Sequence, residues 1–174
     1  MMHSTAVKDI YQAHFAQCAQ QLASNGSSWT QWVRQAAFSR FAAIGFPSTR
    51  EEAWKHTSVA ALAKIPFTPA GYAREALRDD VLIRASFGQM TGPRLVFVNG
   101  HYAPELSSLQ PLPEGVIVGS LAQAISANRR SVEPHLAGYA SFQNHAFVAL
   151  NTAFMQDGAF IYIPPGTSVA APIH

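Results

Sequence analysis

Apolar side chains recur at intervals of three and four residues along the first part of the chain, which is the period of an amphipathic helix. The first such run extends from Thr5 to Ser24 and is stopped by Asn25-Gly26. A second run begins at Ser28, whose hydroxyl can cap a helix, and ends at Gly45. The two runs predict helices that pack as an antiparallel hairpin. Their apolar positions are Val7, Tyr11, Phe15, Cys18 and Leu22 in the first run, and Trp29, Trp32, Val33, Ala36, Ala37, Phe41 and Ile44 in the second.

The next segment, STREEAWKHT, places two acids, a Trp, a Lys and a His within one or two helical turns. These residue types could form a catalytic or metal-binding cluster, or only the start of a capped helix. Ser48 and Glu51 have the spacing of a capping box, in which the hydroxyl accepts from a backbone N–H and the carboxylate reaches back. Glu51 and Glu52 are adjacent, so on a helix they point about 100° apart and cannot flank a substrate. We therefore expect a short helix that buries Trp54 against the preceding hairpin.

After residue 67 the chain becomes rich in β-branched and aromatic residues, which is typical of strands. Strands are predicted in VLIRASF, at residues 81–87, and in RLVFVNGHYAPEL, at residues 94–106. Asn99-Gly100 is the dipeptide that a type I′ hairpin turn favours, because both central residues need positive φ. Pro104 is expected to end the second arm of this hairpin.

A third strand is predicted at residues 116–118, followed by a short helix that Ser120 caps and that ends near Ala127. A further helix is expected in NHAFVALNTAFMQDG, with Asn144 as its cap and Gly158 as its stop. One face of that helix would carry Phe147, Leu150, Asn151 and Phe154.

The last segment, AFIYIPPGTSVAAPIH, predicts a strand, a type II turn at Pro165-Gly166 and a second extended segment. This unit has the size of one corner of a β-solenoid turn. We therefore predict an α+β fold with an N-terminal helical subdomain at residues 1–67. Residues 68–174 would form a mixed segment of short strands and helices, with the first turn of a β-helix core starting at about residue 159.

Composition narrows the classes of protein that fit. The 174 residues are 48% hydrophobic and 13% charged, which excludes general disorder. The net charge is only +2, and the basic residues are scattered apart from Arg129-Arg130, so no nucleic-acid partner is expected. No apolar run approaches the roughly 18 residues that a membrane span needs, and the first residues do not resemble a signal peptide. The predicted location is the cytoplasm, without membrane attachment.

The candidate chemical groups do not combine into a known catalytic or metal-binding motif. The seven histidines lack ligand spacing, and His56 with Glu52 reads as a side-chain pair on one helical face. Cys18 is the single cysteine and lies in an apolar helical stripe, where a thiol is usually buried and inert. No nucleophile elbow or phosphate-binding glycine loop occurs. We therefore predict no catalytic, cofactor-binding or metal-ligating residue, although a metal-dependent enzyme using scattered histidines and a free-standing protein-binding helical module were both considered.

Four blocks resemble, in the same order, the N-terminal part of the SufD branch of the SufB/SufD family. They are GFPSTREEAWKHTSVAALAKIPF, RLVFVNGHYAPELSSL, LPEGVIVGSLAQAI and FVALNTAFMQDGAFIYIPPGTSVAAPIH. The likeness extends from about Phe41 to His174. The positions that we identify as structural family-motif residues are Pro47, Glu52, Trp54, Lys55, Thr57, Asn151, Gly158, Pro165 and Gly166.

The resemblance implies a non-enzymatic scaffold subunit that assembles iron–sulfur clusters together with SufB and the ATPase SufC. Family members are longer, and the rest of the β-helix and the residues linked to the cluster are expected beyond His174. The chain itself is therefore expected to hold no cofactor, with a cluster only in the complete complex. A homodimer is the other expected partner, because Val169–His174 is predicted to be frayed or paired with a strand from another copy.

Overall fold

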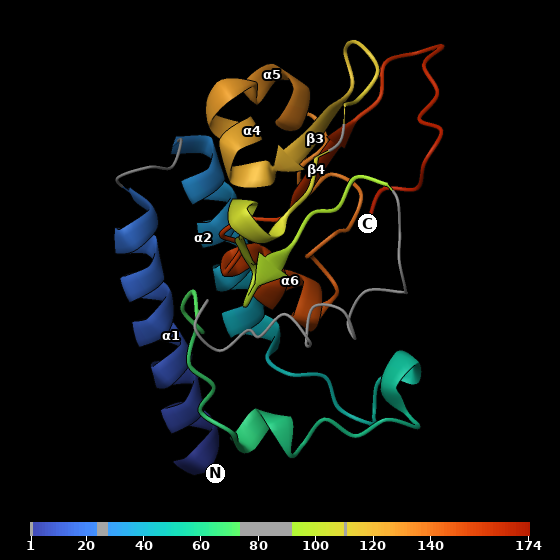
Figure 1. The fold of residues 1–174 in the computed structure, drawn as a ribbon. Helices are drawn as coiled ribbons and strands as arrows, with labels where there is room; N and C mark the ends of the chain where they lie inside the picture. The colour runs from blue at the N-terminus through green and yellow to red at the C-terminus, as the bar shows by residue number, and fades with distance from the viewer. Residues whose placement is uncertain (1, 24–27, 74–91, 110) are drawn as a thin grey trace. The chain divides into compact units, whose positions relative to one another are not determined.

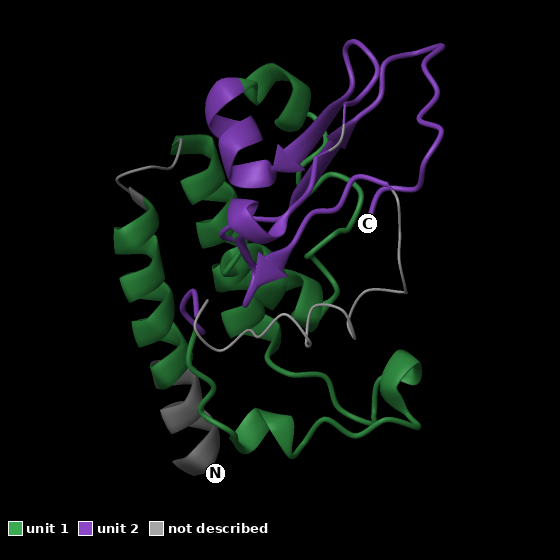
Figure 2. Cartoon of the chain, in the orientation of Figure 1, with its two compact units in different colours: residues 1–69, 128–155 green, residues 70–127, 156–174 purple. Residues whose placement is uncertain are grey.

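The computed structural model describes residues 2–23, 28–73, 92–109 and 111–174, and the chain passes three times between two units (Figure 2). Unit 1 contains residues 1–69 and 128–155, and unit 2 contains residues 70–127 and 156–174. The prediction divided the chain once, after residue 67, whereas in the structure residues 128–155 fold with the N-terminal helices. The strand expected at residues 81–87 lies outside the described residues.

Three helices dominate unit 1: α1 (Met2–Ala23), α2 (Ser28–Ile44) and α6 (Ala146–Ala153). Figure 1 shows α1 and α2 side by side and running in opposite directions, which confirms the predicted hairpin. Helix α6 begins about a hundred residues after α2 ends, yet it packs directly on α2. The core of unit 1 is therefore a three-helix arrangement and not the hairpin alone.

Aromatic rings fill the space between these helices. Phe15 and Phe38 stack with ring centroids 4.2 Å apart, and Tyr11 meets the Phe41 ring edge-on at 5.8 Å. Burial raises the pKa of the Tyr11 hydroxyl, because the phenolate loses hydration there. Alanines allow α6 to approach α2 closely, because their small side chains let two helix backbones come near each other. The buried cluster consists of Tyr11, Phe15, Ala37, Phe38, Phe41, Ala146, Ala149 and Ala153.

Two arginines of α2 hold the two ends of α6. Arg34 is buried, and its Nε donates to the carbonyl of Met155, 2.8 Å away and just beyond the last turn of α6. A cation at a helix C-terminus is stabilised by the helix dipole. Burial nevertheless lowers the pKa of the Arg34 guanidinium, because the charged form is desolvated. Arg40 Nε donates to the carbonyl of Gln143, just before α6 begins.

The rest of unit 1 is made of short elements. Helix α5 spans Arg129–Val132, and 3-10 turns span Glu52–Trp54 and Leu62–Lys64. Helix α5 also approaches the start of α2, where the Arg129 guanidinium lies 5.9 Å from the centre of the Trp29 ring. This distance is within the range of a cation–π interaction.

Unit 2 contains two antiparallel strand pairs. Strand β1 (Phe97–Val98) pairs with β2 (His101–Tyr102) through a turn in which Asn99 and Gly100 have φ values of 52° and 83°. Two positive φ values are what a type I′ turn requires, so the predicted hairpin is confirmed. Strand β3 (Ile117–Ser120) leads into helix α4 (Leu121–Ala127), as the sequence predicts. Strand β3 pairs with β4 (Ala159–Tyr162), which the sequence analysis did not predict.

The last residues pair within the chain. Gly166 has a φ of 76°, and the Thr167 N–H donates to the Pro164 carbonyl at 3.1 Å, which confirms a turn of type II geometry. His174 donates its backbone N–H to the Pro93 carbonyl at 2.8 Å, and its own carbonyl accepts the Leu95 N–H at 2.6 Å. The expectation that this end is frayed or paired with another copy is therefore wrong at His174.

The pairing of His174 has a parallel pattern. His174 forms backbone hydrogen bonds to Pro93 and Leu95, the two neighbours of Arg94, and this is the arrangement found between parallel strands. On its other side, Arg94 forms an antiparallel bridge to Ser108.

The two units together confirm a mixed α+β fold with N-terminal helices. The described residues contain no stack of solenoid turns, so the β-helix core from about residue 159 stays a prediction.

Candidate functional site

The turn at residues 48–51 is built as the capping-box spacing suggests, but only in part. The Ser48 N–H donates to Glu51 Oε1 at 2.9 Å, so the carboxylate reaches back as expected. The Ser48 hydroxyl accepts from the Arg50 N–H at 3.4 Å, one residue earlier than in a capping box. Only the single 3-10 turn Glu52–Trp54 follows, so the predicted short helix is wrong. A lone turn gains no support from propagation.

Trp54 is half-buried, not largely buried as predicted. Its ring lies 5.4 Å from the Phe147 ring of α6, at an angle of 45°. Farther along the chain, Leu62 is 41% exposed and Ile65 is 43% exposed. Trp54 therefore links the turn to α6 through one aromatic contact.

The other charged residues of this segment form local contacts on the surface. Lys55 Nζ and Glu52 Oε1 form an ion pair three residues apart, and both side chains are exposed. Glu52 thus pairs with Lys55, and among the described residues no ion pair joins Glu52 to His56. The Thr57 N–H closes the turn by donating to the Trp54 carbonyl at 2.9 Å. An exposed pair of this kind contributes little stability, so the segment is chiefly a folded turn.

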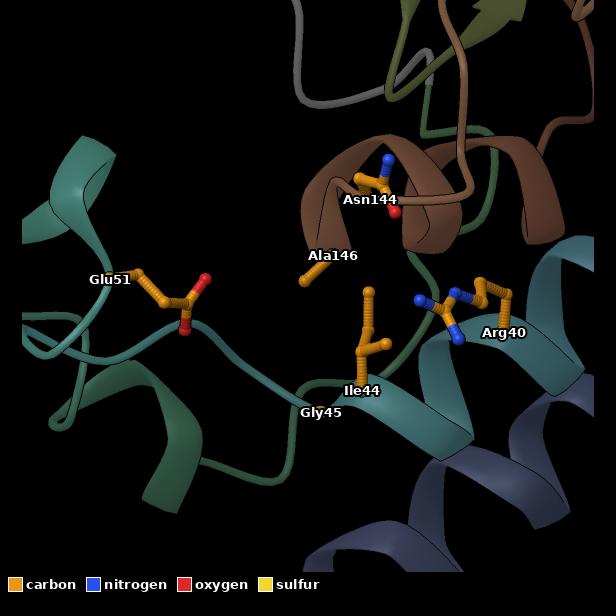
Figure 3. Close-up of a pocket in the computed structure, with 6 residues that line it drawn as sticks. All are labelled: Arg40, Ile44, Gly45, Glu51, Asn144 and Ala146. Atoms are coloured by element: carbon orange, nitrogen blue, oxygen red, sulfur yellow. The ribbon is translucent and has the colours of Figure 1, made fainter.

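A pocket of about 330 Å³ lies beside this turn, entirely within unit 1 (Figure 3). It is formed where the end of α2, the turn at residues 48–51 and the start of α6 meet. Figure 3 shows the Arg40 guanidinium and the Glu51 carboxylate extending towards the same space from opposite sides. The six lining residues are Arg40, Ile44, Gly45, Glu51, Asn144 and Ala146.

The start of α6 differs from the prediction and explains why Asn144 reaches the pocket. The residue in the N-cap position is His145, and it makes no side-chain capping bond. Asn144 precedes it and lines the pocket in place of capping the helix. Gly158 does not stop α6, which ends at Ala153. Asn151, another motif residue, is exposed on the same helix.

Asp157 organises the second unit, a role that the sequence analysis missed. Its Oδ1 accepts from the Ser120 hydroxyl at 2.8 Å, the Ala122 N–H at 2.9 Å and the Gly158 N–H at 2.8 Å. Its Oδ2 lies 3.4 Å from the Tyr102 N–H. The Ser120 hydroxyl in turn accepts from the Gln123 N–H at 3.2 Å, as a helix cap does. Asp157 and Ser120 together cap α4 and fix it to the strands.

The remaining motif residues shape the backbone around this cluster. The Gly158 carbonyl accepts the Leu121 N–H at 2.7 Å, next to the β3–β4 pair. Pro165 and Gly166 form the turn after β4, and Pro47 is buried at the end of α2. Each of these roles is structural.

The candidate metal ligands are dispersed. Cys18 is buried in α1, as expected. In the described ranges, no three His, Cys, Asp or Glu side chains come together as a metal ion would need. Those ranges also hold no helix with the length and apolar character of a bilayer span.

Comparison with known proteins gives a consistent family assignment. Residues 5–174 match the family described as the SufBD protein N-terminal region. The chain is also 33% identical, over 143 residues, to a protein of Synechocystis sp. named as an iron–sulfur cluster assembly SufBD family protein. That alignment covers 81% of this chain and 30% of the length of the relative.

Proposed function

This chain belongs to the SufBD family of iron–sulfur cluster assembly proteins, and on that premise we propose that it is the N-terminal part of a SufD-type scaffold subunit. The observation that carries the proposal is the match of residues 5–174 to the N-terminal region of the family. In this proposal, the β-helix core and the residues that handle iron and sulfur belong to the remainder of such a subunit. The region described here would support that core and contact partner proteins.

Exposed apolar side chains on both units support a role in protein binding. On unit 1, Trp32 is 71% exposed and Tyr139 is 81% exposed. On unit 2, Ile161 and Tyr162 of β4 are exposed, as is Ile163, which follows this strand. Aromatic residues are enriched in protein interfaces, and exposed apolar groups of this size commonly mark them.

We further propose that the partners are SufB and the ATPase SufC, and that the complex works in the cytoplasm. The chain then acts without catalysing a reaction and without a cofactor of its own, and a cluster is built only on the complete complex. A homodimer through the exposed end of β4 is an alternative arrangement of the same scaffold.

Co-purification tests this proposal. The full-length protein that carries this region is expressed with an affinity tag, together with SufB and SufC from the same organism. We expect both partners to co-elute with the tagged protein through a subsequent gel filtration. Elution of the tagged protein without either partner would contradict the scaffold role and favour a free-standing binding module.

A further inference from the structure

We propose that the pocket of unit 1 binds a small zwitterion of the α-amino-acid type, with its carboxylate at Arg40 and its ammonium group at Glu51. The pocket has one cation and one carboxylate that extend into the same space from opposite sides (Figure 3). A ligand with a single charge would meet one attractive and one repulsive group there. A zwitterion meets two attractive groups. This proposal does not depend on the scaffold role.

Each of the two charged groups is held by one hydrogen bond and keeps other atoms that can bind a ligand. The Nε of Arg40 is fixed by the Gln143 carbonyl, which leaves the two terminal nitrogens for a bidentate contact with a carboxylate. The Oε1 of Glu51 accepts the Ser48 N–H, and Oε2 can accept from an ammonium group. Within the described part of the chain, no ion pair joins Arg40 to Glu51. The charges are therefore oriented before a ligand arrives, which lowers the entropy cost of binding.

The size and the apolar lining of the pocket restrict the ligand further. Its volume of about 330 Å³ is near the lower end of the roughly 300–1,000 Å³ that is usual for small-molecule sites. Ile44 and Ala146 contribute apolar surface between the two charges (Figure 3). Gly45 has a φ of 70°, and no atom lies within 4 Å of the place where a Cβ would be. The pocket therefore offers apolar surface to the part of the ligand that lies between its two charged groups.

Titration with L-alanine tests the proposal directly. Backbone amide resonances of the 174-residue chain are followed by ¹⁵N–¹H correlation spectra as L-alanine is added. We expect saturable shifts that centre on Gly45, Glu51 and Ala146. Acetate carries only the negative charge and methylammonium only the positive charge, so each should bind at least about tenfold more weakly than L-alanine. Equal binding of acetate or methylammonium would overturn the proposal, as would a lack of saturation by roughly 10 mM L-alanine.

Two neutralising variants separate the two charges. Arg40→Gln and Glu51→Gln should each weaken L-alanine binding at least about tenfold, because each removes one charge pair. Gln at position 51 keeps an oxygen that can accept the Ser48 N–H, so the turn is preserved. Arg50→Gln is the matched control, since Arg50 is exposed in the same turn and does not line the pocket. Unchanged affinity in Glu51→Gln with native amide dispersion, or equal weakening in Arg50→Gln, would refute the assignment.

Discussion

Removing the Asp157 carboxylate is expected to loosen α4 and β4 together. In Asp157→Ala, the Ser120 hydroxyl and the N–H groups of Ala122 and Gly158 lose an acceptor that lies within 2.9 Å of each. A hydrogen bond to a charged group contributes about 1.5–3 kcal/mol net when it is well shielded. Asp157 is half-buried, so water replaces part of each bond. We therefore expect a loss of about 2–4 kcal/mol in the free energy of unfolding of unit 2.

Hydrogen exchange measures this loss locally, which matters because the two units need not unfold together. The amides of Ala122 and Gly158 are compared between the wild-type chain and Asp157→Ala, alongside urea unfolding of both. Asp157→Asn keeps one carbonyl acceptor and should lose about half as much. Glu114→Ala removes an exposed carboxylate from the same unit and should change stability by less than about 0.5 kcal/mol. Unchanged exchange at Ala122 in Asp157→Ala would refute the role given to this carboxylate.

Three further outcomes follow from the described contacts. Trp54→Ala should cost about 1–2 kcal/mol in urea unfolding, below the 3–5 kcal/mol typical of a fully buried aromatic, because Trp54 is only partly buried, although its ring contacts that of Phe147. A loss above about 3 kcal/mol would mean that the indole is buried. Gly166→Ala should cost about 1 kcal/mol in the free energy of unfolding, because φ is 76° at Gly166. Gly119→Ala should be near neutral, because Gly119 also has open space around it but no positive φ. Equal losses in the two variants would contradict the strain argument. The chain alone should acquire no stoichiometric iron–sulfur cluster in anaerobic reconstitution, since one cysteine cannot supply the ligands of a cluster; a stoichiometric visible chromophore on the monomer would contradict this.

Local patterns predicted the local structure well. The long helical period and its stop at Asn25-Gly26 were enough for α1 and α2. Asn99-Gly100 and Gly166 marked their turns because positive φ restricts the choice of residue so strongly. The predicted helix around Trp54 was wrong for a different physical reason. One turn of helix is costly to nucleate, so tertiary contacts decide such a segment, and here they are few.

Contacts between distant segments could not be predicted. The packing of α6 on α2 depends on Ala146, Ala149 and Ala153, which recur at helical spacing. Alanine is too weakly apolar for this spacing to indicate which face of the helix is buried. Asp157 before a glycine reads as an ordinary turn residue, and its four donors come from three separate segments. The pocket likewise combines Arg40, Glu51 and Asn144 from segments that are up to about a hundred residues apart. Rules of residue spacing apply within one helix or strand, and they do not predict contacts between segments that are far apart in the sequence.

The most direct test of the proposed function is the activity of a cluster-dependent enzyme in cells that lack the full-length protein. Aconitase is suitable because its activity requires an intact iron–sulfur cluster, while its protein level can be measured separately. We predict reduced aconitase activity at an unchanged protein level, with recovery when the full-length gene is restored and when the extract is reconstituted with iron and sulfide. Full aconitase activity in the deletion strain, or a deficit that reconstitution does not repair, would contradict a role in cluster assembly.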